Sequence, residues 1–236
     1  MRRITSLALT GAALLALGQP ASAMPIVAIS LDGTVGAGDI VCGDGSVVPA
    51  GVICASGGSS STLVFNSFLT GSSFGSFGSI ALTAADVSGP GRIELDQNSI
   101  EVSGGAGSLY LFSTQEFDFG SSDPSRFTGA IGGTTDGTVS YEVFVGTSAF
   151  SLATRLLSMS FAPGGADSPF SGKDSDTATL TGSLWLTQVV HASHLGSGPQ
   201  NTSSNATIKV SEPGPLALLG LGLLAAGLLR RRTAQL

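Results

Sequence analysis

Histidine is almost absent from this chain of 236 residues, which limits the enzyme mechanisms open to it. The only two are His191 and His194, so any Ser–His–Asp or histidine–metal scheme would have to use one of them. Residues three apart on a β-strand point to opposite faces, so we do not expect these two to hold one metal ion together. Histidine-based chemistry therefore has little support.

Positive charge is scarce in the middle of the chain. Residues 24–211 hold five of the ten basic residues and fifteen of the sixteen acidic ones, a net charge of −10. Such a surface repels nucleic acid and anionic lipid, and it suits solubility or weak cation binding. We therefore expect no nucleic-acid partner, and we expect no cofactor.

Long runs that favour α-helix are also missing between the two ends of the chain. Glycine, serine and threonine are abundant, and β-branched and aromatic residues come in short groups between glycine-rich turns. That pattern is typical of an all-β domain. A spacing of about ten residues between the groups favours an antiparallel β-sandwich over alternating strands and helices.

The sequence predicts thirteen strands. They are Ile26–Leu31, Thr62–Leu69, Ser79–Thr83, Arg92–Leu95, Ser99–Ser103, Ser108–Ser113, Glu116–Phe119, Arg126–Ile131, Thr138–Val145, Ser151–Thr154, Leu157–Phe161, Thr177–Val190 and Ala206–Val210. In the ninth of these, Val139, Tyr141, Val143 and Val145 share one face, as a half-buried strand requires. The twelfth is too long for one strand, and Gly182 suggests a bulge or bend within it.

The first 23 residues read as a secretory signal peptide. Met1-Arg2-Arg3 is a positive start, Ile4–Leu17 is an apolar core, and Ala21-Ser22-Ala23 is a small-residue cleavage site. We expect cleavage after Ala23, which makes the protein an exported one.

The last residues read as a membrane anchor. Seventeen uncharged residues lie between Glu212 and Arg230, and as a helix they span roughly 25 Å of a hydrocarbon layer about 30 Å thick. The cluster Arg230, Arg231 and Arg232 stops the span and places the C-terminus on the cytoplasmic side. We expect a transmembrane helix over 214–229; the alternative is a buried core helix.

The order of these terminal features resembles a known sorting signal. Ser211-Glu212-Pro213, then a Leu/Gly-rich apolar run, then an arginine cluster is similar to the PEP-CTERM tail of Gram-negative bacteria, with Ser211 where the family has its first proline. The resemblance implies export to an exosortase-type membrane processing enzyme that cuts near this motif. It also implies an association with exopolysaccharide and biofilm. Asp174–Thr181 resembles a stretch that recurs in the same family shortly before the tail.

These signals divide the chain into four parts. We expect a signal peptide at 1–23, a β-rich ectodomain at 24–195, a flexible linker at 196–210 and a sorting tail at 211–236. The linker rests on the polar run from Gly196 to Asn205. In this arrangement the inner membrane holds the protein by its C-terminal helix until processing, after which it reaches the cell surface or extracellular matrix.

Cys42 and Cys54 are the only cysteines and both lie in the exported part. Pro49-Ala50-Gly51 between them suits a turn, so we expect a disulfide. A metal site is the alternative, but it needs more ligands nearby than the sequence offers.

Candidate catalytic and calcium-binding motifs are weak. Gly71–Gly75 matches G-x-S-x-G, but no helix start follows it and chance alone accounts for such a match in a chain this rich in glycine and serine. Asp32 to Asp44 and Asp174 to Thr177 are acidic groups without a complete calcium-loop pattern, and such residues are ordinary turn formers. We assign no catalytic residue and no metal ligand, and we expect a protein that is not an enzyme.

Two main functions remain. The first is an exported surface or matrix protein whose partners are the secretion translocon, the exosortase-type enzyme, exopolysaccharide and the membrane. The alternative is a carbohydrate- or calcium-binding module in which Trp185, Tyr141 and Tyr110 stack on sugar rings. A secreted hydrolase using Ser73 and His191 is a third, weaker hypothesis.

Overall fold

The structure is a computed structural model that describes residues 24–43, 46, 48–66, 74–88, 92–119, 124–196 and 198–211. All thirteen elements in this part of the chain are β-strands, and every pairing between them is antiparallel. The expected all-β, antiparallel architecture is therefore confirmed. Within these ranges there is no helix of the length and apolar character that crossing a membrane requires.

One sheet has six strands in the order β10-β9-β12-β7-β1-β2. Their bounds are β1 Ile26–Ser30, β2 Ile40–Cys42, β7 Gly107–Phe119, β9 Thr138–Gly146, β10 Thr154–Phe161 and β12 Gly182–His194. The long central strands β7 and β12 pair over their whole length, from Gly182 opposite Phe119 to His194 opposite Gly107.

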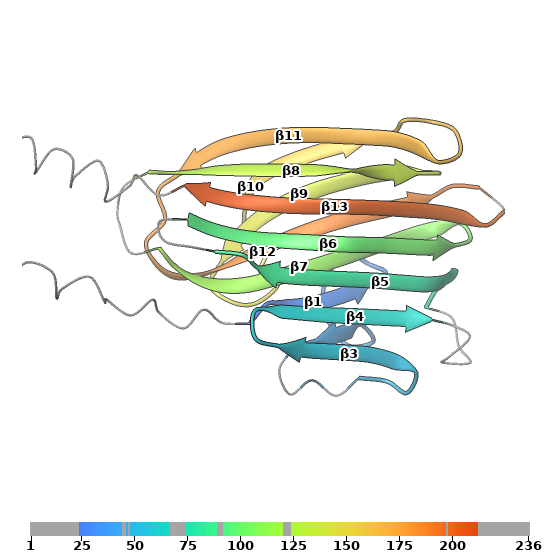
Figure 1. The fold of residues 1–236 in the computed structure, drawn as a ribbon, viewed down its shortest axis with the longest axis horizontal. Helices are drawn as coiled ribbons and strands as arrows, with labels where there is room; N and C mark the ends of the chain where they lie inside the picture. The colour runs from blue at the N-terminus through green and yellow to red at the C-terminus, as the bar shows by residue number, and fades with distance from the viewer. Residues whose placement is uncertain are drawn as a thin grey trace, which may run out of the picture.

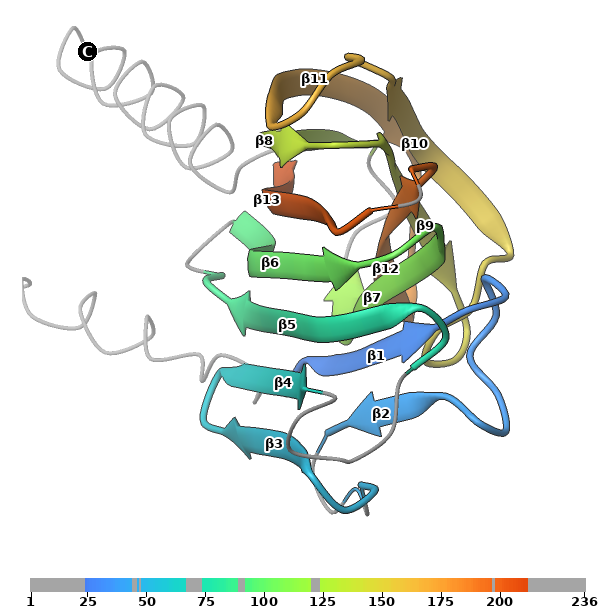
Figure 2. The same cartoon turned by 90° about the vertical axis from the view of Figure 1, so that its right-hand side faces the viewer.

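The other sheet has seven strands in the order β11-β8-β13-β6-β5-β4-β3 and lies in front in Figure 1. Their bounds are β3 Val52–Gly57, β4 Ser60–Asn66, β5 Phe77–Asp86, β6 Arg92–Gly104, β8 Ser125–Thr135, β11 Ser168–Ala178 and β13 Gln200–Ser211. Figure 2, turned by 90°, shows this sheet lying against the six-stranded one as two layers. The domain is thus a β-sandwich.

Alternation of side chains along the strands builds the core between the layers. In β9 the predicted face of Val139, Tyr141, Val143 and Val145 is buried, at 0–4% exposure, while the residues between them are only half-buried. Leu63, Ile80, Leu95 and their neighbours on the facing sheet complete one continuous cluster. Burial of this apolar surface is the main force that holds the sheets together.

Most of the predicted strands exist, but several boundaries were wrong. The pairs of strands expected between residues 92 and 103 and between 108 and 119 are single strands, β6 and β7. Strands β2, β3 and most of β11 were missed. Gly182 does not bend a long strand: β11 ends at Ala178, and Gly182, with φ of +75°, is the first residue of a separate strand, β12.

The prediction of a flexible linker at 196–210 was wrong. Residues 200–211 form β13, which lies between β6 and β8 inside the seven-stranded sheet. Ala206, Ile208 and Val210 point into the core and are at most 2% exposed. The segment is polar in sequence because its alternate residues face outward and because Thr202 and Ser204 on its buried face are also polar, not because it is a spacer.

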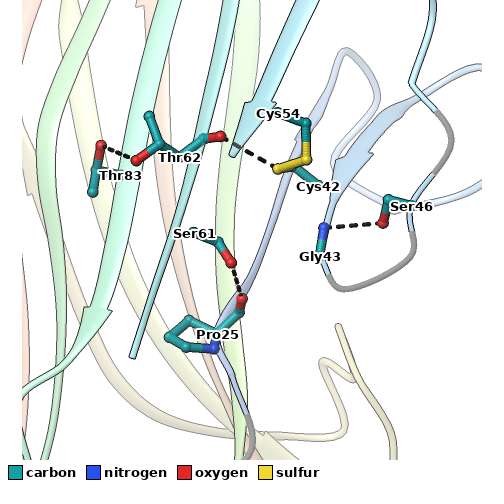
Figure 3. Close-up of a disulfide and its surroundings, with 8 residues drawn as sticks. All are labelled: Pro25, Cys42, Gly43, Ser46, Cys54, Ser61, Thr62 and Thr83. Atoms are coloured by element: carbon teal, nitrogen blue, oxygen red, sulfur yellow. Dashed lines mark hydrogen bonds between the residues drawn. A yellow bond between two sulfur atoms is a disulfide. The ribbon is translucent and has the colours of Figure 1, made fainter. Parts of the chain in front are cut away.

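The expected disulfide is confirmed. Cys42 of β2 is bonded to Cys54 of β3, with a Cα–Cα distance of 5.6 Å (Figure 3). These are edge strands of different sheets, so the bond closes one side of the sandwich. Closing a loop of this size stabilises the fold by about 3 kcal/mol in the chain-entropy model. Nearby, the Ser61 hydroxyl donates to the Pro25 carbonyl (2.5 Å) and joins the two layers a second time.

Several predictions fall outside the described residues. They concern the signal peptide with Ala21 and Ala23, the motif residues Glu212 and Pro213, the helix 214–229, the cluster Arg230, Arg231 and Arg232, and Ser73 of the hydrolase hypothesis.

Candidate functional site

The three aromatic residues proposed to stack on sugars do not share one surface. Tyr141 is completely buried, and its hydroxyl donates to Gln188 Oε1 (2.6 Å) inside the core. Burial raises the pKa of this hydroxyl well above its usual value. Tyr141 is therefore a core residue, and the prediction that it contacts a ligand was wrong.

Tyr110 and Trp185 lie on the outer face of the six-stranded sheet, but apart from each other. Tyr110 is stacked on His191, with ring centroids 4.1 Å apart and nearly parallel planes. Trp185 is six residues from His191 along β12, which is roughly 20 Å. Between them, Phe150 of the β9–β10 connection packs edge-on against Phe112 and covers the middle of this face. No continuous aromatic platform results.

The two histidines point to opposite faces, as their spacing predicts. His191 stacks on Tyr110 outside, whereas His194 is 1% exposed and packs against Phe77 in the core. His194 Nε2 is 3.0 Å from the hydroxyl of Thr202, which in turn is 2.8 Å from that of Thr135. Burial lowers the pKa of His194, and the negative charge of Asp136 opposes this only in part.

The buried histidine predicts a pH-dependent stability. Because the pKa of His194 in the folded protein is below its unfolded value of 6.5, the unfolded chain binds a proton that the folded chain does not. The free energy of unfolding should therefore fall as the pH drops below about 6.5. His191, whose pKa is also lowered by burial despite the charge of Glu142, adds to the same trend. Urea unfolding between pH 7.5 and 5.5 measures it.

Variants separate the two histidines in this experiment. His194→Gln keeps a polar group beside Thr202 and should flatten part of the dependence, and adding His191→Gln should remove most of it. The carboxyl groups with shifted pKa values, Asp32 and Asp136, are lowered below 3.8 and do not titrate in this window. An unchanged pH slope in the double variant would show that other groups control it.

The described residues of the two acidic groups make local hydrogen bonds or lie in a strand; Asp44 is outside the described residues. Asp32 closes a turn, where its Oδ1 accepts from the backbone N–H (2.9 Å) and hydroxyl (2.9 Å) of Thr34. Those bonds lower the pKa of Asp32. Asp174 and Asp176, expected in a turn, instead lie in the edge strand β11. Across the ranges that the structure describes, no three His, Cys, Asp or Glu side chains come together.

A hollow on the outer face of the seven-stranded sheet is the candidate site. It has a volume of about 300 Å³ and is lined by residues of β6, β13 and β8. These three strands are neighbours in the sheet, as the ribbon in Figure 1 shows. Its polar lining residues are Glu94, Asp96, Asn98, Asn205, Thr207 and Lys209. Ala130 and Gly132 of β8 face outward with almost no side chain, so the surface is recessed there. The sequence analysis did not identify this site.

The charged residues of the hollow are held in place. The Glu94 side chain is only 6% exposed and lies between Arg92 and Lys209, with N–O distances of 2.7 and 3.0 Å. Asp96 Oδ1 accepts a short hydrogen bond from the Thr207 hydroxyl of the neighbouring strand. Because two cations share one buried carboxylate, Glu94 is neutralised and fixes the position of both.

A bulge in β6 shapes the other end of the hollow. The pairing of β6 with β13 shifts register near Ser99, a non-glycine residue with φ of +54°. Asn205 Oδ1 accepts from the Ser99 N–H (2.8 Å), which leaves the amide NH₂ of Asn205 directed away from that bond. The hollow thus presents donors from Asn205 and Lys209 and an acceptor from Asp96.

Comparisons with known proteins identify no family. No family model matches the chain, and no curated protein matches it. TmCBM61, solved in complex with beta-1,4-galactotriose, is similar over 47% of this chain and 68% of its own, with a TM-score of 0.31 and 14% identity.

Two further solved structures are similar over more of the chain. One is the Family 11 Carbohydrate-Binding Module from Clostridium thermocellum, over 82% of this chain and 99% of its own, with a TM-score of 0.24 and 11% identity. The other is the structure of the infectious bursal disease virus Gx strain, over 85% and 59%, with a TM-score of 0.33 and 10% identity. At TM-scores this low, none of these likenesses bears on what the chain binds.

Proposed function

We propose that this is an exported, non-enzymatic protein of the cell surface or extracellular matrix whose β-sandwich binds carbohydrate. The observation that carries the proposal is the hollow on the seven-stranded sheet, where fixed donors and acceptors surround a recess floored by Ala130 and Gly132. Carbohydrate hydroxyls need such paired donors and acceptors, and the small floor leaves room for a sugar ring.

The hydrogen-bonding groups suit a ligand rich in hydroxyls. Asp96 accepts, Asn205 and Lys209 donate, and Asn98 can do both through its amide. These groups come from two adjacent strands of a rigid sheet, so little conformational entropy is lost when a ligand binds.

Two observations support a protein without enzyme activity. His194 is sealed in the core. His191 pairs across the strands with Ser140 and lies near Glu142, but its ring is stacked on Tyr110 and its buried Nε2 has no hydrogen-bond partner among the described residues. In the hollow, Glu94 is already paired with Lys209 and Arg92, so it is not a free acid or base for hydrolysis.

The export part of the proposal rests on the sequence of the two ends. We propose removal of residues 1–23, an anchor in 214–229, and processing near Ser211-Glu212-Pro213 by an exosortase-type enzyme. Intact-mass analysis of fractionated native protein tests this. A mature protein that still begins at Met1, or one recovered entirely from the soluble cytoplasm, would contradict it.

Filling the hollow tests the binding proposal. Ala130→Phe puts a ring where the recess lies, and it should weaken binding to any polysaccharide that the parent chain retains by about tenfold or more. Affinity electrophoresis through gels containing polygalacturonate, xylan, dextran or mixed-linkage glucan measures this, with and without calcium.

The matched control for that variant is Ala81→Phe. Ala81 faces outward on β5 of the same sheet, beside Glu101, and is not part of the hollow. It should leave binding unchanged. Equal retention of both variants would remove the hollow as the binding site, and a parent chain that none of the four gels retards would count against carbohydrate binding itself.

A further inference from the structure

The positive charges of this acidic domain gather around the hollow. Of the five basic residues in 24–211, Arg92, Arg126, Lys173 and Lys209 belong to β6, β8, β11 and β13, four neighbouring strands of the seven-stranded sheet. Only Arg155 lies elsewhere, on β10 of the other sheet, where it pairs with Glu142 (2.9 Å). The domain thus carries four of its five basic residues on one sheet.

Strand register places these four side chains on the outer face. Arg126 and Lys209 each precede a buried residue and point away from the core, and Arg92 and Arg126 both pair with Ser211. Lys173 pairs with Ala130 of the hollow, and so shares its face. At about 4.8 Å between strands, Lys173 and Lys209 lie roughly 10–12 Å apart across the recess.

Within the described residues, only two of these four cations form ion pairs, and both share one carboxylate. Arg92 and Lys209 share the single carboxylate of Glu94. Lys173 and Arg126 form no ion pair with any residue in the described part of the chain, and Arg126 instead donates to the Ser175 hydroxyl (3.2 Å). The outer face of these four strands carries four cations and three carboxylates, those of Glu94, Asp96 and Glu101. On a domain of net charge −10, a face with this local excess of positive charge favours anions.

We propose that the ligand of the hollow is an acidic polysaccharide. This rests on the proposed carbohydrate binding and names its chemical class. Lys173, Arg126 and the Arg92–Lys209 pair meet the carboxylates of successive acidic sugars, while Asp96 and the asparagine amides meet their hydroxyls. The cations lie on both sides of the recess, so a linear chain crosses β8 with charged contacts on either side.

A membrane surface fits the same charges less well. The overall charge of −10 repels anionic lipid, and a flat headgroup layer would press against the carboxylate of Asp96 without using the recess. We therefore argue for a polysaccharide and make lipid binding an outcome of the test.

The experiment compares one polymer with and without its charges. The full chain, held in neutral phosphatidylcholine nanodiscs, is titrated with fluorescent polygalacturonate and with its fully methyl-esterified form, which has the same backbone and no carboxylates. We expect binding of the acidic form to be about tenfold tighter or more, and to weaken about tenfold between 50 and 300 mM NaCl because salt screens exposed charges.

Charge variants then locate the contact. Lys173→Gln with Arg126→Gln should weaken binding of polygalacturonate about tenfold, while Arg155→Gln, the remaining basic residue on the opposite sheet, should not change it. All three substituted side chains are exposed, so the double variant and the Arg155→Gln variant should both fold like the parent.

The outcomes separate the two proposals. Equal, salt-insensitive binding of both polymers would overturn the acidic class and leave carbohydrate binding standing. If the chain bound neither polymer, both the acidic class and carbohydrate binding would be overturned for polygalacturonate-type ligands. A third outcome is that the chain binds added phosphatidylglycerol vesicles but not polygalacturonate, and that the double variant Lys173→Gln with Arg126→Gln no longer binds the vesicles. That outcome would replace the polysaccharide by a lipid surface.

Discussion

A chain that ends at Ser211 is expected to fold, and a chain that ends at Pro199 is not. The difference is β13, which pairs with β6 on one side and β8 on the other. Its removal takes Ala206, Ile208 and Val210 out of the core and splits the seven-stranded sheet into two parts. Each large aliphatic side chain lost from the core costs about 1.5–3 kcal/mol. Together with the lost strand pairing, these losses are comparable to the free energy of unfolding of an ordinary domain, which is about 5–15 kcal/mol.

Thermal unfolding followed by circular dichroism measures the effect on chains that begin at Met24. The form ending at Ser211 should show a cooperative transition, and the form ending at Pro199 should show none or should aggregate. If 196–210 were the flexible linker that its composition suggests, both forms would melt at the same temperature. That result would exclude the position of β13 in the sheet.

The strands that the sequence predicted well are those with a clear alternation of apolar and polar residues. In β9, Val139, Tyr141, Val143 and Val145 are separated by Ser140, Glu142 and Phe144, and a period of two is the direct signature of a strand with one buried face. The location of Tyr141 in the core follows from that same pattern. Assigning it to a ligand-binding surface overlooked the evidence of its neighbours.

The sequence predicted only the second half of β13, as the strand Ala206–Val210, because core positions in the first half are polar. Thr202 and Ser204 are at most 2% exposed, and they read in sequence as part of a serine- and asparagine-rich spacer. Thr202 is tolerated inside because its hydroxyl contacts both Thr135 and His194. Such a network joins residues far apart in the chain, so no local pattern reveals it.

Edge strands were missed for a different reason. Strand β11 is mostly exposed because it lies at the edge of its sheet. Charged residues such as Lys173 and Asp174 interrupt the alternation that would have predicted a strand, and they protect the edge from pairing with another chain. Strand β2 is three residues long and is held by its pairing with β1 and by the disulfide. Short and exposed strands bury too little to leave a hydrophobic pattern.

The sequence analysis could not identify the hollow because missing side-chain volume at two small residues creates it, and no sequence motif marks it. Its recess exists where Ala130 and Gly132 lie beside the longer side chains of β13 and β6. Strand β8 is followed in the chain by β9, yet its neighbours in the sheet are β11 and β13. Only the register of these strands shows that residues as far apart as Asp96 and Thr207, 111 positions, line one site.

The end of β13 also changes how the predicted sorting motif relates to the domain. Ser211 is paired with Arg92 on one side and with Arg126 on the other. The motif Ser211-Glu212-Pro213 therefore begins at the last residue of the sheet, with no spacer before it. A processing enzyme that cuts near this motif would have to work directly against the folded domain.

The second large effect is expected from one methyl group at Gly133. A Cβ at this position would lie 1.9 Å from the Ser203 carbonyl oxygen and 2.8 Å from the Ser204 Cα, and both are backbone atoms of β13. Gly133→Ala must therefore push β8 and β13 apart near the C-terminal end of β8. We expect a loss of about 3 kcal/mol or more, which lowers the melting temperature by roughly 2–4 °C for each kcal/mol.

The neighbouring residue supplies the control. A Cβ at Gly132 would meet only the Phe170 carbonyl oxygen at 3.5 Å and Ser171 at 3.6 Å, which are ordinary contacts on the outer face. Gly132→Ala should therefore leave stability unchanged or raise it by up to about 1 kcal/mol, because alanine loses less backbone freedom on folding. Urea unfolding of the two variants gives the comparison. If Gly133→Ala were as stable as Gly132→Ala, β8 and β13 would not approach each other as closely as the structure places them, and the register that builds the hollow would have to be revised.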